Sequence, residues 1–356
     1  MNLKMKTLAV AMLAAGTMTS AQAAEVLFPY VVNSSTVTTV VSVVNANPTN
    51  TGPGANLHYR LWYKDGANAE VNSANCLETD VLRSTSFLDI QSVDLGGKFG
   101  ASTLGVLFND PSVNNNWKYA NQSFALASFA AKPMRGWLLV DDNSSNAQGA
   151  QTGASGDLQG EAMVFEFASG AAWGYQAGVG DVGVGSGFTD PASTVNFGNG
   201  LAALVNFAPF TETETKFFVT PLMAFGVAPG MNGPLGNNND NPANTIPDGY
   251  RLALGDNAFA IVDRDENIIS GAVPQDVTCV GSVNAKTLIS GATLAQVPNG
   301  GWSILTGQSR GDAVPGTNVV IGGATVIKLD YNVKSTFNGE TTKGVYNNAY
   351  ILKGLI

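Results

Sequence analysis

The chain has little charge and almost none of the residues most often used in catalysis. Of its 356 residues, 13% are charged, which is about half the usual quarter. Its single histidine is His58. A zinc site needs several His, Cys or carboxylate ligands at short spacings, and the sequence around His58 has no such pattern. We therefore do not expect a zinc enzyme, and we predict that His58 lies on the polar face of a strand.

Long apolar runs are also missing, apart from a short one near the start. Lys4 and Lys6 are followed by an apolar run at 8–15 and then by Ala-Gln-Ala at 21–23. This is the layout of a secretory signal peptide, and the run is too short to span a bilayer. We expect cleavage after residue 23 and a mature chain in the periplasm, on the outer surface or outside the cell. We expect no transmembrane helix in the mature chain.

Basic residues are outnumbered by acidic ones. The chain has 18 Lys plus Arg against 27 Asp plus Glu, a net charge of -9. Removal of Lys4 and Lys6 leaves 16 basic residues, which makes the mature chain -11. Because an acidic surface repels phosphate backbones and anionic lipids, nucleic acid is not an expected partner. Asn, Thr, Ser and Gly supply the polarity instead, a composition that indicates an exported, β-rich protein.

Two cysteines, Cys76 and Cys279, are the only ones present. In an oxidising compartment an even pair predicts a disulfide. The bridge would close a loop of about 200 residues and stabilise the fold by roughly 5 kcal/mol on the chain-entropy model. The alternative is two separate buried thiols.

Three stretches give the clearest strand signals. The first mature stretch, 26–45, is rich in Val and Thr, and from Thr36 onward both of its faces are apolar or Thr/Ser. Such a strand belongs inside a sheet. Residues 56–64 alternate as a half-buried strand, with Lys64 on the polar face, and Asp65-Gly66 is a strong hairpin signal. Residues 216–225 are apolar on both faces, and Pro221 there indicates a bulge or an edge position.

Many short strands separated by turn residues, with no alternation of strand and helix, predict a mainly β fold. We expect an antiparallel β-sandwich with long Gly/Asn-rich loops and one or two short helices. The candidate helices are at 120–131 and after Asn284, which is a suitable N-cap residue.

The domain organisation has two possible readings. After a signal peptide at 1–23, residues 24–356 form a single β-sandwich domain with a long loop at 226–249, which is rich in Gly, Pro and Asn. Alternatively that segment links two β domains, 24–225 and 250–356. A bridge between the two cysteines would favour the single domain.

Two catalytic motifs match only in spacing. Gly178-x-Gly180-x-x-Gly183 resembles a dinucleotide fingerprint, but the glycines and proline that follow exclude the required helix. Ser309 has the spacing of a nucleophile elbow, yet the only histidine, His58, precedes it, and no helix can follow. We expect no catalytic site. The alternative is that a different fold brings Ser309 and His58 together. The Arg-Gly-Asp tripeptide at 310–312 is interpreted as a turn.

The one candidate cofactor is calcium. Asp263, Asp265 and Asn267 offer oxygen ligands at alternate positions of a predicted hairpin turn, and Asp240 lies in the Asn-rich segment. The glycine and the distal glutamate of an EF-hand loop are absent. A solvated turn is the main expectation, and a weak calcium site is the alternative.

Taken together, the sequence predicts a secreted bacterial envelope or cell-surface protein with a structural or binding role, and no enzyme. Its expected partners are other envelope or surface components, or further copies of itself. One alternative is a porin-like outer-membrane β-barrel, which Gly- and aromatic-rich strands such as 165–175 favour. The C-terminal residues 350–356 disfavour it because they lack a terminal aromatic. An exported hydrolase is the other alternative.

Overall fold

The computed structural model describes twelve parts of the chain: residues 25–46, 56–74, 76–96, 133–141, 158–180, 202–222, 250–255, 259–309, 323–333, 335–337, 340–342 and 347–352. Several predicted features lie outside these residues: the signal peptide at 1–23, the helix at 120–131, the loop at 226–249 with Asp240, and the tripeptide at 310–312.

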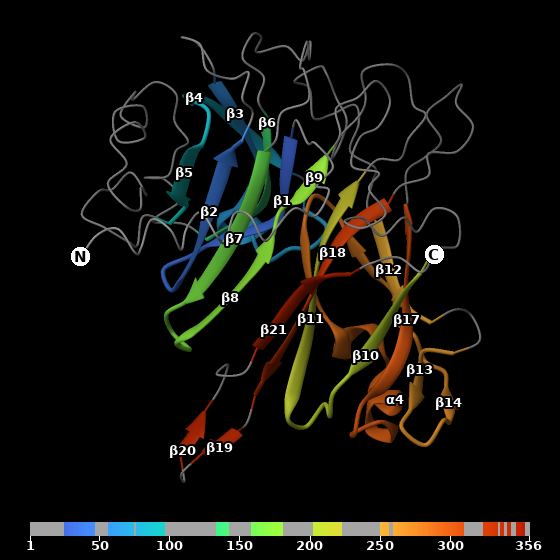
Figure 1. Ribbon diagram of the computed structural model, residues 1–356. Coiled ribbons are helices and arrows are strands. Elements are labelled where there is room, and N and C mark those ends of the chain that lie inside the picture. Colours follow the sequence, from blue (N-terminus) through green and yellow to red (C-terminus); the bar gives the residue numbers. More distant parts are fainter. Residues whose placement is uncertain are drawn as a thin grey trace, which may run out of the picture.

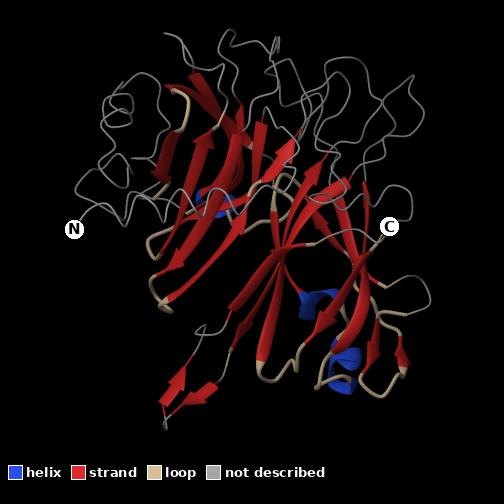
Figure 2. Ribbon diagram, viewed as in Figure 1, coloured by secondary structure: helices blue, strands red, loops and turns tan. Residues whose placement is uncertain are grey.

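The fold is mainly β, and its strands pair antiparallel, as predicted (Figures 1 and 2). Near the N-terminus two sheets, A and B, face each other. Sheet A has the order β4 (Leu77–Ser84), β3 (Asn56–Asp65), β6 (Met134–Asp141), β1 (Glu25–Asn33) and β9 (Gly178–Gly180). Sheet B has the order β5 (Asp89–Asp94), β2 (Val37–Asn45), β7 (Leu158–Glu166) and β8 (Ala171–Gln176).

The second half of the chain forms two more sheets. Sheet C has the order β16 (Gly281–Asn284), β11 (Thr213–Leu222), β18 (Gly323–Asn332) and β21 (Asn347–Ile351). Sheet D has the order β14 (Ile268–Ile269), β13 (Ile261–Asp263), β17 (Gly301–Ser309), β12 (Tyr250–Leu254) and β15 (Gln275–Val277), and β10 (Ala203–Phe207) also pairs with β17. A small hairpin, β19 (Ser335–Phe337) and β20 (Glu340–Thr342), projects from the body beside β21 (Figure 1).

Buried side chains gather in two cores, and strand β11 serves both. Phe217 and Val219 pack in the core between sheets C and D, whereas Phe218 packs in the core of the N-terminal half. Side chains alternate across a strand, so one strand apolar on both faces can join two cores. The prediction of burial on both faces is confirmed for residues 217–221, whereas residues 223–225 of the predicted stretch lie outside the described residues. Pro221 pairs with β18 on one side of β11. On the other side the pairing with β16 ends at Val219, so the absence of an N–H group at Pro221 removes no hydrogen bond to β16.

The predicted strand at 26–45 is two strands. The chain turns at Ser34–Thr36, so that β1 lies in sheet A and β2 in sheet B. The second part behaves as expected: β2 pairs with β5 on one side and β7 on the other, inside its sheet. The Val/Thr composition favours a strand throughout but does not mark this turn.

The strand ends at Asp65 and the chain returns antiparallel to it, as predicted, but Asp65-Gly66 does not form a two-residue hairpin turn. After β3 the chain forms a 3-10 turn, η1 (Gly66–Asn68), and a longer loop before it returns as β4, where Leu77 pairs with Tyr63. The loop contacts the second half of the molecule, and this contact buries Lys64, which was expected on the polar face.

The helix predicted after Asn284 is present in two short pieces, η4 (Ala285–Leu288) and α4 (Gly291–Gln296). The Asn284 side chain caps the first piece by accepting a hydrogen bond from the backbone N–H of Lys286 at 3.0 Å. Ser290 caps the second. No helix among the residues described above is long and apolar enough to cross a membrane.

Candidate functional site

The two halves of the molecule, with sheets A and B in one and sheets C and D in the other, meet at two contrasting places. We call them the seam, which is formed around Lys64, Asn72 and the disulfide, and the cleft, which lies between β8 and sheet C.

The disulfide prediction is confirmed, because Cys76 and Cys279 are bonded, with their Cα atoms 5.4 Å apart. The two residues are separated by 203 positions. Cys76 lies between β3 and β4 of the first half, and Cys279 lies between β15 and β16 of the second. The bond therefore ties together segments that are distant in sequence.

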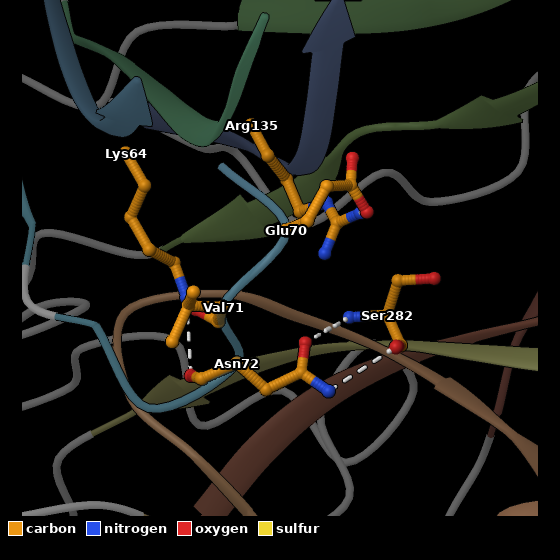
Figure 3. Close-up of polar contacts among 6 residues, drawn as sticks. All are labelled: Lys64, Glu70, Val71, Asn72, Arg135 and Ser282. Atoms are coloured by element: carbon orange, nitrogen blue, oxygen red, sulfur yellow. Dashed lines mark hydrogen bonds and ion pairs between the residues drawn. The ribbon is translucent and has the colours of Figure 1, made fainter. Parts of the chain in front are cut away.

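Beside the disulfide, the buried Lys64 links the two halves through its ammonium group, whose contacts within its own half are drawn in Figure 3. The side chain is only 1% exposed. Its Nζ donates to the carbonyl oxygens of Val71 and Asn72 in its own half, at 2.8 and 3.1 Å. It also donates to the carbonyl oxygen of Thr278 in the other half at 3.0 Å. Three acceptors match the three donors of a lysine ammonium.

Burial sets the protonation of this lysine. Removal from water disfavours its charged form, and the nearby positive charge of Arg135 acts in the same direction, while Glu70 opposes both. Together they lower the pKa of Lys64 to about 7. The seam therefore holds a group that titrates near neutral pH.

Asn72 completes the seam with a two-way hydrogen bond to the backbone of Ser282 (Figure 3). Its Oδ1 accepts from the Ser282 N–H at 3.1 Å, and its Nδ2 donates to the Ser282 carbonyl at 3.3 Å. Its own carbonyl oxygen accepts from the Thr278 N–H at 2.8 Å. The Asn72 side chain thus pairs with the backbone of Ser282 in β16 much as a neighbouring strand would.

The cleft opens between the β7–β8 hairpin and sheet C and has a volume of about 490 Å³. At its rim, Asn347 of β21 donates from Nδ2 to the carbonyl oxygen of Ala172 in β8 at 2.7 Å. The residues that line it come from β2, the β7–β8 hairpin and three strands of sheet C: Thr36, Val37, Glu166, Ala168, Ser169, Ala171, Trp173, Lys216, Phe218, Leu329, Tyr331 and Asn347.

Stacked aromatic rings form the base of the cleft. The rings of Trp173 and Phe218 are almost parallel, at 4°, with their centroids 5.1 Å apart. The ring of Tyr30 stacks on that of Phe218 from the side of the N-terminal core, with the two ring centroids 3.9 Å apart. The stack joins a strand of sheet B to a strand of sheet C, so the base of the cleft is a rigid part of the core.

Opposite charges line the two walls. On one wall, the carboxylate of Glu166 accepts long hydrogen bonds, both 3.4 Å, from Trp173 Nε1 and Ser169 Oγ. On the other, the Lys216 ammonium lies 5.4 Å from the ring centroid of Tyr331. These two walls can together receive a ligand that carries both acceptors and donors.

Behind the Lys216 wall, Glu214 holds Tyr331 in place. Its carboxylate accepts hydrogen bonds from the Tyr331 hydroxyl and from Asn284 Nδ2. Burial raises the pKa of Glu214, but the Tyr331 hydrogen bond and the Lys216 charge outweigh it and leave the pKa below its usual value. Glu214 therefore stays ionised at neutral pH.

The predicted calcium residues lie in the exposed turn between β13 and β14. Asp263 Oδ1 accepts from the backbone N–H groups of Asp265 and Asn267 at 2.9 and 2.8 Å, and Oδ2 accepts from Asn267 Nδ2 at 2.9 Å. These bonds, first those from Asn267, lower the pKa of the Asp263 carboxyl. The carboxylate is thus engaged in the turn itself. Asp240 lies outside the described residues, so calcium binding stays a prediction.

The other motif residues are spread over different sheets. His58 is in β3 of sheet A, and Ser309 is the last residue of β17 in sheet D. Gly178 and Gly180 lie in β9, which pairs with β1 as a strand, and Gly183 lies outside the described residues. Within the parts of the chain that the structure describes, no three His, Cys, Asp or Glu side chains gather into a metal-binding group.

Sequence reasoning missed the residues that matter most here. Lys64 looked like one polar position in an alternating strand, and Glu166 like the end of one. Lys216 is the most visible in the sequence, since it adjoins a run that is otherwise apolar on both faces. A cleft assembled from five separate segments of the chain leaves no local signal.

Comparison with models of known protein families gives no match for this chain, and comparison with curated proteins gives none either.

Proposed function

We propose that this chain is an exported binding protein of the bacterial envelope, without catalytic activity, and that the cleft is its ligand site. The ligand class is a small zwitterion, of which free amino acids are the simplest. Its anionic group would meet Lys216, its ammonium group would meet Glu166, and its apolar part would rest against the base formed by Trp173 and Phe218.

The observation that carries the proposal is the pairing of opposite charges over an aromatic base within about 490 Å³. Ligand sites commonly have volumes of about 300–1,000 Å³ and combine apolar walls with a few convergent polar groups. Among the described residues, neither Glu166 nor Lys216 forms an ion pair. A ligand that brings one charge of each sign therefore gains two charge-assisted contacts without leaving a net charge in the cleft.

Thermal unfolding of the mature, disulfide-bonded protein tests the proposal. Each of the twenty common amino acids is added separately at 10 mM, and pyranose monosaccharides form the contrasting class. Any ligand that raises the melting temperature is then titrated by calorimetry. A ligand present at a hundred times its dissociation constant stabilises the folded state by about 2.7 kcal/mol.

Variants then locate the site. Lys216→Met and Glu166→Gln should each remove the stabilisation, because each removes one charge of the pair. The matched controls Arg251→Met and Asp276→Asn alter an exposed ion pair on sheet D and should leave binding unchanged. No response to any amino acid, or a response that both cleft variants retain, would reject the proposal.

A further inference from the structure

A chain of polar side chains behind the cleft determines which hydrogen bonds Tyr331 can offer to a ligand. The chain begins at the N-cap of η4, where Asn284 Oδ1 accepts from the backbone N–H of Lys286 at 3.0 Å. Because its oxygen is used in this way, the Asn284 amide turns Nδ2 toward Glu214, and Nδ2 can only donate. The helix cap therefore makes Oε1 of Glu214 an acceptor.

The other oxygen of Glu214 sets the direction of the hydrogen bond to Tyr331. An ionised carboxylate has no proton to donate, so Oε2 receives the proton of the Tyr331 hydroxyl. Burial and this hydrogen bond raise the pKa of Tyr331, so the hydroxyl is not ionised at neutral pH. Since Glu214 is not among the residues that line the cleft, the Tyr331 oxygen presents only lone pairs to a ligand there.

The aromatic rings of the cleft offer little to a ligand cation. The Lys216 ammonium lies 5.4 Å from the ring centroid of Tyr331, so a second cation at this ring would meet a like charge. Trp173 and Phe218 stack on each other and are each only 5% exposed. The described lining residues thus form no open aromatic cage of the kind that holds quaternary ammonium groups. A ligand amine must be recognised through its N–H groups.

A second acceptor for such an amine lies near the Tyr331 hydroxyl. The charge of Glu166 contributes to the raised pKa of Tyr331, so the two groups are close enough to interact. Trp173 Nε1 and Ser169 Oγ each donate to Glu166 over 3.4 Å. A carboxylate has about four lone-pair sites, so Glu166 keeps acceptor capacity for a ligand. An amine that meets both Glu166 and Tyr331 needs two N–H groups.

We propose that Tyr331 and Glu166 make the cleft selective for zwitterions whose amine carries at least two N–H groups. This inference rests on the proposed function and adds to it the chemistry of the amine. Amino acids and their N-methyl derivatives meet the requirement. Betaines, which carry the same two charges on a quaternary nitrogen and a carboxylate, do not. Tyr331 contacts the ligand, whereas Glu214 and Asn284 act through Tyr331 as positioning residues.

Calorimetry of the mature, disulfide-bonded protein with a methylated ligand series tests this selectivity. The probes are the amino acid that binds best and its N-methyl, N,N-dimethyl and N,N,N-trimethyl derivatives, whose charges are the same but whose N–H groups fall from three to none. The first two should bind with similar affinity. The dimethyl compound should bind about tenfold more weakly and the trimethyl compound about a hundredfold, since each of these steps removes one charge-assisted hydrogen bond.

Two variants separate the loss of hydrogen bonds from crowding by the added methyl groups. Tyr331→Phe keeps the ring but removes the acceptor, so it should weaken binding of the amino acid about tenfold. It should also abolish the difference between the N-methyl and dimethyl compounds. Glu214→Gln changes no residue that lines the cleft. Its amide nitrogen donates to the Tyr331 oxygen and turns the hydroxyl proton toward the cleft, so it should alter the ligand series in the same way.

The matched control is Tyr350→Phe. It removes the same hydroxyl from a tyrosine whose ring also lies near a lysine, with Lys328 at 5.5 Å, but which does not line the cleft. The ligand series should be unchanged. Circular dichroism and melting temperature show whether each variant folds, and the series on the wild type decides the matter if the variants do not.

The outcomes distinguish this inference from the proposed function. A trimethyl compound that binds as tightly as the amino acid overturns the selectivity, while the cleft remains an amino-acid site. The same conclusion follows if folded Tyr331→Phe and Glu214→Gln both keep the full loss at the dimethyl compound. If no amino acid binds at all, the proposed function is rejected and this inference is rejected with it.

Discussion

The seam and the cleft lie between the same two halves of the molecule, but they are built in opposite ways. The seam is closed by a covalent bond and by the buried Lys64 and half-buried Asn72, whose hydrogen bonds cross from one half to the other. The cleft is bordered by Glu166 and Lys216, whose charges face an open volume. The difference separates two roles, because changes in the seam should alter stability, whereas changes in the cleft should alter binding.

The strongest way to break this contrast is to remove the covalent link. Replacing Cys76 and Cys279 together by Ser should lower the free energy of unfolding by about 5 kcal/mol, since the bond closes a loop of 203 residues. Urea denaturation followed by circular dichroism measures the change. A loss below about 1 kcal/mol would mean that the polar contacts of the seam suffice on their own.

A pH series tests the buried lysine. The unfolded chain keeps the Lys64 proton up to about pH 10.5, whereas the folded chain releases it near pH 7. Unfolding therefore takes up a proton between these values, and the folded state should gain about 1.4 kcal/mol per pH unit as the pH rises above 7. The gain is lost again as the pH falls through about 7.

Denaturation measured at pH 7, 8 and 9 in the wild type and in Lys64→Met checks the sign. The variant has no proton to exchange at this position. Its free energy of unfolding should therefore rise with pH less steeply than that of the wild type, by about 1.4 kcal/mol per pH unit. Equal slopes in the two proteins would show that Lys64 stays charged in the seam.

A smaller loss of stability is expected at Asn72. Asn72→Ala removes two hydrogen bonds to the backbone of Ser282 and should cost about 2 kcal/mol in the free energy of unfolding. The control Asn348→Ala changes an exposed asparagine of β21 and should stay within about 0.5 kcal/mol. If both variants lose the same free energy of unfolding, the contact between Asn72 and Ser282 stabilises the protein no more than an exposed side chain does.

The smallest stability effects should come from the cleft. Lys216→Met and Glu166→Gln remove charges that border an open volume, so each should change the free energy of unfolding by about 0.5 kcal/mol or less. Denaturation without added ligand measures this change. A loss as large as that of Asn72→Ala would make these residues structural and would blur the distinction between seam and cleft.

The sequence was sufficient for the mainly β fold, the disulfide and the burial of residues 217–221 on both faces, because each rests on local composition or on a unique pairing. It was insufficient where distant segments meet. Lys64 follows the alternation of a half-buried strand, and only the second half of the chain, which supplies the Thr278 carbonyl, makes it a buried residue. The cleft residues Glu166 and Lys216 belong to separate sheets, so their proximity depends on tertiary packing.

The turn within 26–45 escaped prediction for a related reason. Val and Thr favour a strand on both sides of Ser34, and the chain reverses there with no glycine or proline to mark it. The helix start at Asn284 was predicted correctly, because a capping side chain bonds a backbone N–H within its own turn and can be recognised from the local sequence.

Strand β11 sets a limit on how this protein can change its length. Phe217 and Phe218 are neighbours in sequence but belong to different cores. Inserting or deleting one residue within the strand would exchange the two faces beyond that point, and both cores would receive the wrong side chains at once. Length variation between homologues of this chain should therefore fall outside residues 213–222, and a single-residue insertion there should be among the least tolerated changes in the whole protein.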